Sequence, residues 1–198
     1  MAIDFSQVKA ITIPEGSVTK ITDSTGNILW QGVQSEGWHT IWEGNTTCSI
    51  TKNGNNNPAA SGAVPNLAQT FPGTGYKPKI RITFNHSNTN TDYDKWKDKF
   101  IVNGSTKTTI SSPLTIDAVG DLSFFSTYNI LAIMCNSIDN NASNSVSLGI
   151  VLKKTRDTEN NNIIISLDKI SSGSDNDIRA HSGKFTITLT VTKIEQYY

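Results

Sequence analysis

Apolar and polar residues alternate along much of this chain, which is the pattern of half-buried β-strands. The clearest examples are residues 79–84, Lys-Ile-Arg-Ile-Thr-Phe, and residues 184–192, Lys-Phe-Thr-Ile-Thr-Leu-Thr-Val-Thr. Every second side chain is apolar in both, so one face of each strand is predicted to be buried and the other solvated. Residues 130–135 and 163–165 are apolar without alternation, which predicts strands buried on both faces.

Strand patterns recur from residue 38 to the end of the chain, at the spacing of an antiparallel β-sandwich. Residues 53–77 contain three prolines and few apolar residues, so a long surface loop is predicted there. One helical turn is predicted around Tyr93 to Asp98. A jelly-roll-like strand order and an immunoglobulin-like order both stay open. The predicted strands are 38–43, 47–52, 79–86, 98–103, 106–110, 113–117, 121–126, 129–136, 146–153, 162–168 and 184–194.

A separate β pattern occupies residues 1–32. Alternation is present over residues 8–13 and 18–22, and a third apolar segment follows at residues 28–30. Segments rich in Gly, Pro and Asp, which favour turns, separate the three. The sequence therefore predicts an all-β protein, with a short N-terminal meander followed by the sandwich.

The predicted meander is too small to be stable by itself. About 30 residues without a disulfide or a metal bury too little apolar surface. The meander is expected to pack on the rest of the chain, on a copy of itself or on another protein. We predict an attachment or oligomerisation module at 1–32, a polar linker at 33–37 and a β-sandwich domain at 38–198. The predicted interface residues are Val8, Ile11, Ile13, Val18, Ile21, Leu29 and Trp30.

Composition agrees with strands joined by polar turns. Asn, Ser and Thr make up about one-third of the chain. Charged residues are 17% and cancel to a formal net charge of zero, so nucleic acid is not an expected partner. Polar residues interrupt the first ten positions, which excludes a signal peptide there. The longest apolar run, 130–135, is far shorter than the ~20 residues of a membrane helix, so a soluble protein without membrane insertion is expected.

Residues with metal-binding or nucleophilic chemistry are scattered along the chain. Cys48 and Cys135 belong to no CxxC pattern and are predicted to be free, semi-buried thiols. Asp175 and Asp177 are weak candidates for a calcium site, but a solvated turn explains them better. The three histidines lie on separate segments. No serine-hydrolase elbow, Walker loop or dinucleotide fingerprint occurs, so neither an enzyme nor a cofactor is expected.

Aromatic residues are the most suggestive side chains for recognition. Trp38 and Trp42 share the parity of one predicted strand and are interpreted as sandwich core. Tyr76, Tyr93 and Trp96 are candidate ligand contacts, because exposed rings stack on sugars or anchor protein interfaces. Trp96 lies among charged and aromatic neighbours, which predicts partial exposure.

The N-terminal segment also resembles a known group of proteins. I-P-E-G at 13–16, V-T-K-I at 18–21 and G-x-x-L-W at 26–30 resemble a leader of virion proteins in tailed phages of gut bacteria. In that group the leader precedes unrelated β-rich domains. The resemblance covers about residues 5–31 and implies an attachment module that is buried against the virion or in a homo-oligomeric stalk. The rest of the chain resembles no family.

Two functions follow as expectations. The first is a non-enzymatic virion structural protein of a phage tail, baseplate, fibre or capsid decoration. It would assemble in the host cytoplasm with other virion proteins, form a homo-oligomer, and expose a sandwich to a host-surface glycan or protein. The second is a stand-alone carbohydrate-binding module that uses Tyr93, Trp96 and the 53–77 segment.

Overall fold

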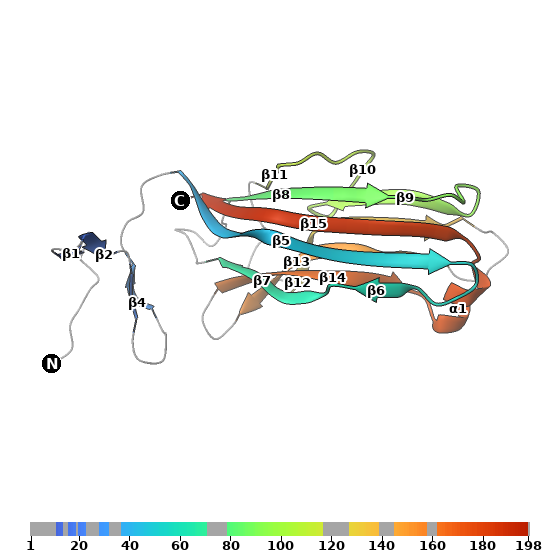
Figure 1. The fold of residues 1–198 in the computed structure, drawn as a ribbon, viewed down its shortest axis with the longest axis horizontal. Coiled ribbons are helices and arrows are strands. Elements are labelled where there is room, and N and C mark those ends of the chain that lie inside the picture. Colours follow the sequence, from blue (N-terminus) through green and yellow to red (C-terminus); the bar gives the residue numbers. More distant parts are fainter. Residues whose placement is uncertain are drawn as a thin grey trace. The chain divides into compact units, whose positions relative to one another are not determined.

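The structure is a computed structural model, which describes residues 11–13, 16–18, 20–22, 28–31, 37–70, 79–116, 127–138, 145–157 and 162–197. The chain divides into two compact units, one within Met1–Gly37 and the other spanning Trp38–Tyr197 (Figure 1).

The described residues of the N-terminal unit form two antiparallel hairpins. Strand β1 (Ile11–Ile13) pairs with β2 (Gly16–Val18), and β3 (Lys20–Thr22) pairs with β4 (Ile28–Gln31). The predicted three-stranded meander is therefore wrong in detail. The segment expected to be one strand over 18–22 divides in two, because its first part pairs backwards in the chain and its second part pairs forwards. Among the predicted interface residues, only Val8 lies outside the described residues.

The second unit is an antiparallel β-sandwich, as the sequence predicts. A six-stranded sheet has the order β10-β9-β12-β13-β14-β7, and a five-stranded sheet has the order β11-β8-β15-β5-β6 (Figure 1). One short helix, α1, precedes the last strand. The elements are β5 (Trp38–Asn53), β6 (Ala59–Ser61), β7 (Val64–Thr70), β8 (Lys79–Asn88), β9 (Trp96–Val102), β10 (Ser105–Lys107), β11 (Leu114–Ile116), β12 (Thr127–Ser137), β13 (Ser147–Asp157), β14 (Asn162–Ser172), α1 (Asp175–Ala180) and β15 (Lys184–Tyr197).

The strand order is close to a jelly roll but differs in one pairing. The pairs β5–β15, β7–β14 and β9–β12 are nested, as in a jelly roll. A regular jelly roll would also pair β8 with β13. Here β8 pairs with β15 and β11, and β13 lies between β12 and β14.

Strands β5 and β15 run the length of the five-stranded sheet (Figure 1). Phe185 and Leu189 of β15 are buried between the sheets. Thr190 and Thr186 alternate with them, and their hydroxyls meet those of Thr47 and Thr51 at 2.8 and 3.1 Å. The strict alternation of this segment thus produces the expected pair of faces, one apolar and one hydroxylated.

Aliphatic side chains from both sheets form the main core. The members come mostly from the centres of β8, β12, β13, β14 and β15, and Trp42 packs against their edge. A smaller cluster of Ala132, Met134 and Val151 lies apart from it on β12 and β13. Residues 130–135 are buried and contribute to both clusters, as predicted, whereas Ile164 in the segment 163–165 is only half-buried.

Several local predictions are corrected. Residues 59–61 and 64–70 of the expected long loop are strands β6 and β7, and β7 is an edge strand, where Pro65 costs no ladder hydrogen bond. The expected helical turn at 93–98 is a hydrogen-bonded turn followed by β9. The predicted strand at 121–126 lies outside the described residues.

Candidate functional site

The end of the sandwich opposite Trp38 is built from three segments: residues 53–58 after β5, residues 89–95 between β8 and β9, and residues 173–183 around α1. We call it the distal tip. In Figure 1, β5 runs from its start near the C-terminus to this end, where α1 lies. The first and third of these segments are more than a hundred residues apart in the sequence.

The tip is built over a buried tryptophan. Trp96 is fully buried, with its ring 5.0 Å from that of Phe185 and 6.1 Å from that of His181, both at steep angles. Its indole N–H donates to the carbonyl of Ser182 at 3.0 Å. A Cβ on Gly183 would overlap this indole, and Gly183 has a φ of 150°, so glycine is required there on two grounds.

The burial of Trp96 corrects the expectation that it is partly exposed. Its neighbours in sequence are charged, but Trp96 is the first residue of β9 and points between the sheets. Its ring faces therefore contact protein and are closed to a ligand. Tyr76 lies outside the described residues. Of the three predicted ligand contacts, Tyr93 is the one described as exposed, at 62%.

A buried amide holds the segment that carries Tyr93. The side-chain oxygen of Asn90 accepts the Asp92 backbone N–H at 3.0 Å, and its amide nitrogen donates to the carbonyl of Trp96 at 2.8 Å. The N–H of Trp96 in turn donates to the carbonyl of Asp92 at 2.9 Å. Asn90 is only 6% exposed, so these hydrogen bonds hold the turn around Tyr93 on its buried side.

Hydrogen bonds also join the three segments of the tip. Gly54 N–H donates to the carbonyl of Gly183 at 2.8 Å, and Thr91 N–H donates to the carbonyl of Lys184 at 3.1 Å. The Lys184 N–H donates to the Asp92 carboxylate, and the Lys95 ammonium donates to the Ser182 hydroxyl at 3.1 Å. The tip is thereby preorganised, which lowers the entropic cost of binding.

Lys52 fixes the turn that follows β5. Its side chain is fully buried, and its ammonium donates to the carbonyls of Gly54 and Asn56, both at 2.7 Å. Burial lowers the pKa of this ammonium. The side chains of residues 55–57 remain exposed above it.

The weak calcium candidates have a structural role in the tip. Ser174 caps α1: its hydroxyl accepts the Asp177 N–H at 3.2 Å, while the Asp177 carboxylate accepts the Ser174 N–H at 3.0 Å. This is a capping box, and Asp175 stands in the first turn of the same helix. Over the ranges that the structure describes, no group of three or more His, Cys, Asp or Glu side chains could hold a metal ion.

The opposite end of the sandwich carries a cluster of charged and aromatic side chains, which we call the proximal cluster. Arg81 donates twice to the Glu195 carboxylate, at 2.7 and 2.9 Å, and its guanidinium lies 4.5 Å from the Trp38 ring centre. Trp38 also packs edge-on against Tyr197 at 5.4 Å. Bonding to Arg81, with further support from Lys193, lowers the pKa of Glu195 to about 2.

The expectation that Trp38 and Trp42 share a face does not hold. Trp42 packs against the core, whereas Trp38 packs against Tyr197 and Arg81. The register of β5 against β15 shifts between Thr40 and Trp42. The regular alternation of side chains between the two faces is therefore interrupted between Trp38 and Trp42.

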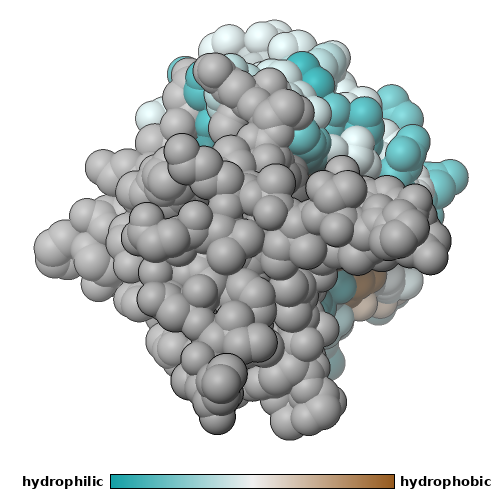
Figure 2. Space-filling view, turned by 90° about the vertical axis from the view of Figure 1, so that its left-hand side faces the viewer, coloured by the Kyte–Doolittle hydropathy of each residue, from teal (hydrophilic) through white to brown (hydrophobic). Residues whose placement is uncertain are grey.

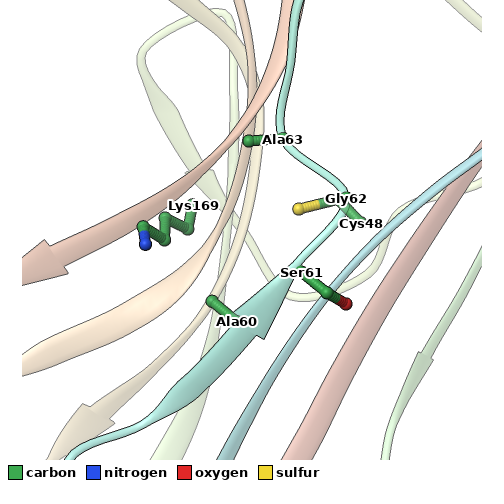
Figure 3. A pocket seen from close by; sticks show the side chains of 6 residues that line it. All are labelled: Cys48, Ala60, Ser61, Gly62, Ala63 and Lys169. Atoms are coloured by element: carbon green, nitrogen blue, oxygen red, sulfur yellow. The ribbon is translucent and has the colours of Figure 1, made fainter.

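Both cysteines are free and buried. Cys48 lines a recess of about 150 Å³ where the chain crosses from β6 to β7, and Lys169 of β14 lines the same recess (Figure 3). Burial, and secondarily Asp168, raises the pKa of Cys48. Burial also raises the pKa of Cys135 to about 12. Protonated thiols are poor nucleophiles, and the recess is smaller than the ~300 Å³ of typical ligand sites.

The described surface is mainly polar. The coloured atoms visible in Figure 2 are mostly hydrophilic or intermediate, with one small hydrophobic area. Among the residues whose exposure is described, Tyr93 is the exposed large hydrophobic side chain. No helix in the described part of the chain is both long and apolar enough to span a membrane.

Comparison with known proteins gives no match: no protein-family model, no curated protein and no solved structure is similar to this chain. The class defined by the structure is that of an all-β protein with an antiparallel sandwich. The sequence predicts Tyr93 as a ligand contact, and the structure describes its exposure; the sequence did not indicate Asn90, Ser182 and Gly183, which contact the turn around it or the ring beneath it. Their roles depend on contacts across the fold, and no local sequence signal marks them.

Proposed function

We propose that this chain is a non-enzymatic structural protein of a tailed-phage virion, in which the N-terminal unit attaches to the particle and the sandwich is displayed. The observation that carries the proposal is the division of the chain at Gly37 and Trp38. A unit of two short hairpins is followed by a sandwich whose core is formed by its own residues.

The small size of the N-terminal unit supports an attachment role. Two-stranded hairpins of three or four residues a strand are marginal in water and gain stability by packing on a partner. The resemblance of residues 5–31 to the phage leader supplies that partner: other virion proteins, or further copies of the chain in a homo-oligomer. The proposed location in the virion is the tail, the baseplate, a fibre or the capsid decoration.

The test compares the full chain with a variant that lacks residues 1–37. We expect the full chain to copurify with phage particles and to form a defined oligomer by size-exclusion chromatography with light scattering. The truncated chain is expected to be a folded monomer that is absent from particles. A point variant, Trp30→Ala in the full chain, should weaken incorporation into particles. Its sandwich should keep the melting temperature of the wild type, which shows that the loss is not due to unfolding.

The second candidate is a stand-alone carbohydrate-binding module, and the exposure of Tyr93 on a preorganised tip favours it. A stand-alone module should have the same oligomeric state with and without residues 1–37. If both forms are identical monomers and neither copurifies with particles, the virion proposal is overturned and the module becomes the better assignment.

A further inference from the structure

We propose that the distal tip binds a neutral, hydroxyl-rich glycan, with the Tyr93 ring stacked on a sugar. This inference rests on the proposed function in one respect: the glycan belongs to the surface that a displayed sandwich meets. The location, chemistry and rigidity of the tip each support it.

The location follows from strand β5. Residue 38, to which the N-terminal unit is covalently joined, begins β5, and the tip begins where β5 ends at Asn53. Sixteen extended residues at about 3.3 Å each separate the two ends by roughly 50 Å. Along this strand, the tip is the part of the sandwich most remote from Trp38, to which the N-terminal unit is covalently joined.

The exposed side chains of the tip match the hydrogen-bonding groups of a sugar. Asn55, Asn57 and Asn176 present amides that both donate and accept, and Asp94 and Asp175 present carboxylate acceptors. Hydroxyl groups of a sugar need both kinds of partner. Tyr93 adds an aromatic face for the apolar side of a pyranose ring, together with a phenol that can donate and accept.

The charge of the tip disfavours anionic polymers. Its three segments contain four aspartates against one lysine and one arginine. Arg179 donates to Asn57 at 3.3 Å, and Lys95 donates to Ser182, so both cations already have partners. Lys52 and Lys184 border these segments and balance the remaining aspartates, so the tip offers no excess positive charge to attract phosphate-rich or uronic-acid polymers, and a neutral glycan needs none.

A protein partner fits the tip less well than a glycan. Interfaces between proteins bury several aromatic and aliphatic anchors in their centres. Ile178 in the tip and Trp96 beneath it are buried in the fold, and among the tip residues Tyr93 is the large hydrophobic side chain that is exposed. A single ring surrounded by amides and carboxylates provides the contact of one stacked sugar with hydrogen bonds at its rim.

The test uses the purified full-length protein on a printed array of neutral and anionic bacterial surface polysaccharides, followed by biolayer interferometry on each polysaccharide that binds. We expect binding to neutral polysaccharides. Tyr93→Ala should weaken the affinity about tenfold, and Tyr93→Phe, which keeps the ring, should stay within about threefold of the wild type. Thr40→Ala, an exposed change at the other end of β5, is the matched control and should have no effect.

Asn90→Ala separates positioning from contact. Asn90 is buried, so its loss should lower affinity by loosening the turn, with increased amide hydrogen exchange at 91–95. The glycan proposal is overturned if no polysaccharide binds, if only anionic ones bind, or if Tyr93→Ala leaves the affinity unchanged. Tyr93→Ala protein should still copurify with particles; if wild-type protein binds glycan but is absent from particles, the virion function fails and the glycan site stands.

Discussion

The two ends of the sandwich each contain a tryptophan, but they are stabilised in different ways. At the distal tip, Trp96 is buried, and the segments around it are joined by backbone hydrogen bonds and by bonds of the Asp92 and Lys95 side chains. At the proximal cluster, Trp38 is half-buried and stacks against the guanidinium of Arg81, which is bonded to Glu195. The distal tip is centred on a buried ring, whereas the proximal cluster is centred on an ion pair.

This difference predicts how each end responds to conditions. Packing and neutral hydrogen bonds change little between pH 3 and pH 8, whereas an ion pair weakens as its carboxylate is protonated and as salt screens it. The packing of the buried Trp96 ring is of the first kind, so the core beneath the distal tip should keep its shape over a range of solution conditions. The proximal cluster, next to the join with the N-terminal unit, can tolerate the second kind.

The largest effect is expected from removing the ring beneath the tip. Trp96→Ala should destabilise the sandwich by about 3 to 5 kcal/mol, because it leaves a cavity against Phe185 and frees the Ser182 carbonyl. Urea denaturation followed by far-UV circular dichroism measures this free energy. Trp96→Phe is the control that keeps most of the packing and should cost less. A loss below 1 kcal/mol for Trp96→Ala would show that the tip does not depend on this ring.

The case of Trp96 also shows how far the sequence predicts the fold. Alternation is a local signal, and it identified the long strands, including β8 and β15, and the sandwich class. Trp96 has charged sequence neighbours, yet it is buried because Gly183, 87 residues later in the chain, has no side chain to exclude the indole. A local sequence pattern does not predict such a match between distant positions. It does not predict the pairing of β7 with β14 either.

The second effect tests the proximal cluster through pH. Glu195 has a folded-state pKa of about 2, below its ordinary value of 4.5, because Arg81 bonds its charged form. A depressed carboxylate pKa contributes stability that is present above about pH 4.5 and is lost as pH falls towards 2. We expect the wild type to lose about 1 to 2 kcal/mol more than Glu195→Gln over this window. The free energy of unfolding, measured by urea titration at each pH, gives the comparison.

Two controls make this test specific. Arg81→Gln should reduce the difference between Glu195 and its amide variant, since the partner that depresses the pKa is gone. Raising the salt concentration to 1 M should also reduce it. Parallel acid profiles for the wild type and Glu195→Gln would mean that the pair contributes nothing to stability.

A smaller effect is expected at the cap of α1. Ser174→Ala removes the hydroxyl that accepts the Asp177 N–H, and loss of such a cap costs about 1 kcal/mol. Because α1 has six residues, the change should appear chiefly as faster amide exchange at 175–180. Ser174→Thr keeps the hydroxyl and should recover most of the protection. Equal exchange in all three proteins would show that the capping box is dispensable.

The capping box was also a signal available in the sequence. Ser174 followed three residues later by Asp177 is close to the pattern that begins many helices, but Gly173 and the polar surroundings favoured a turn. Tyr93 could be predicted as exposed because it lies in a polar turn. The residues that hold it could not, because Asn90 acts through the carbonyl of Trp96, and a backbone acceptor leaves no mark in the sequence.

The smallest effect concerns the ring of the proximal cluster. Trp38→Leu removes the stacking of Arg81 and should cost about 0.5 to 1 kcal/mol, since the cluster is partly exposed to solvent. Trp38→Phe keeps an aromatic face and should cost less. Trp38→Leu and Glu195→Gln should not be additive, because both remove a partner that holds the same guanidinium in place. Additive free energies in this cycle would show that Arg81 makes two independent contacts, and the proximal cluster would then be a set of separate pairs.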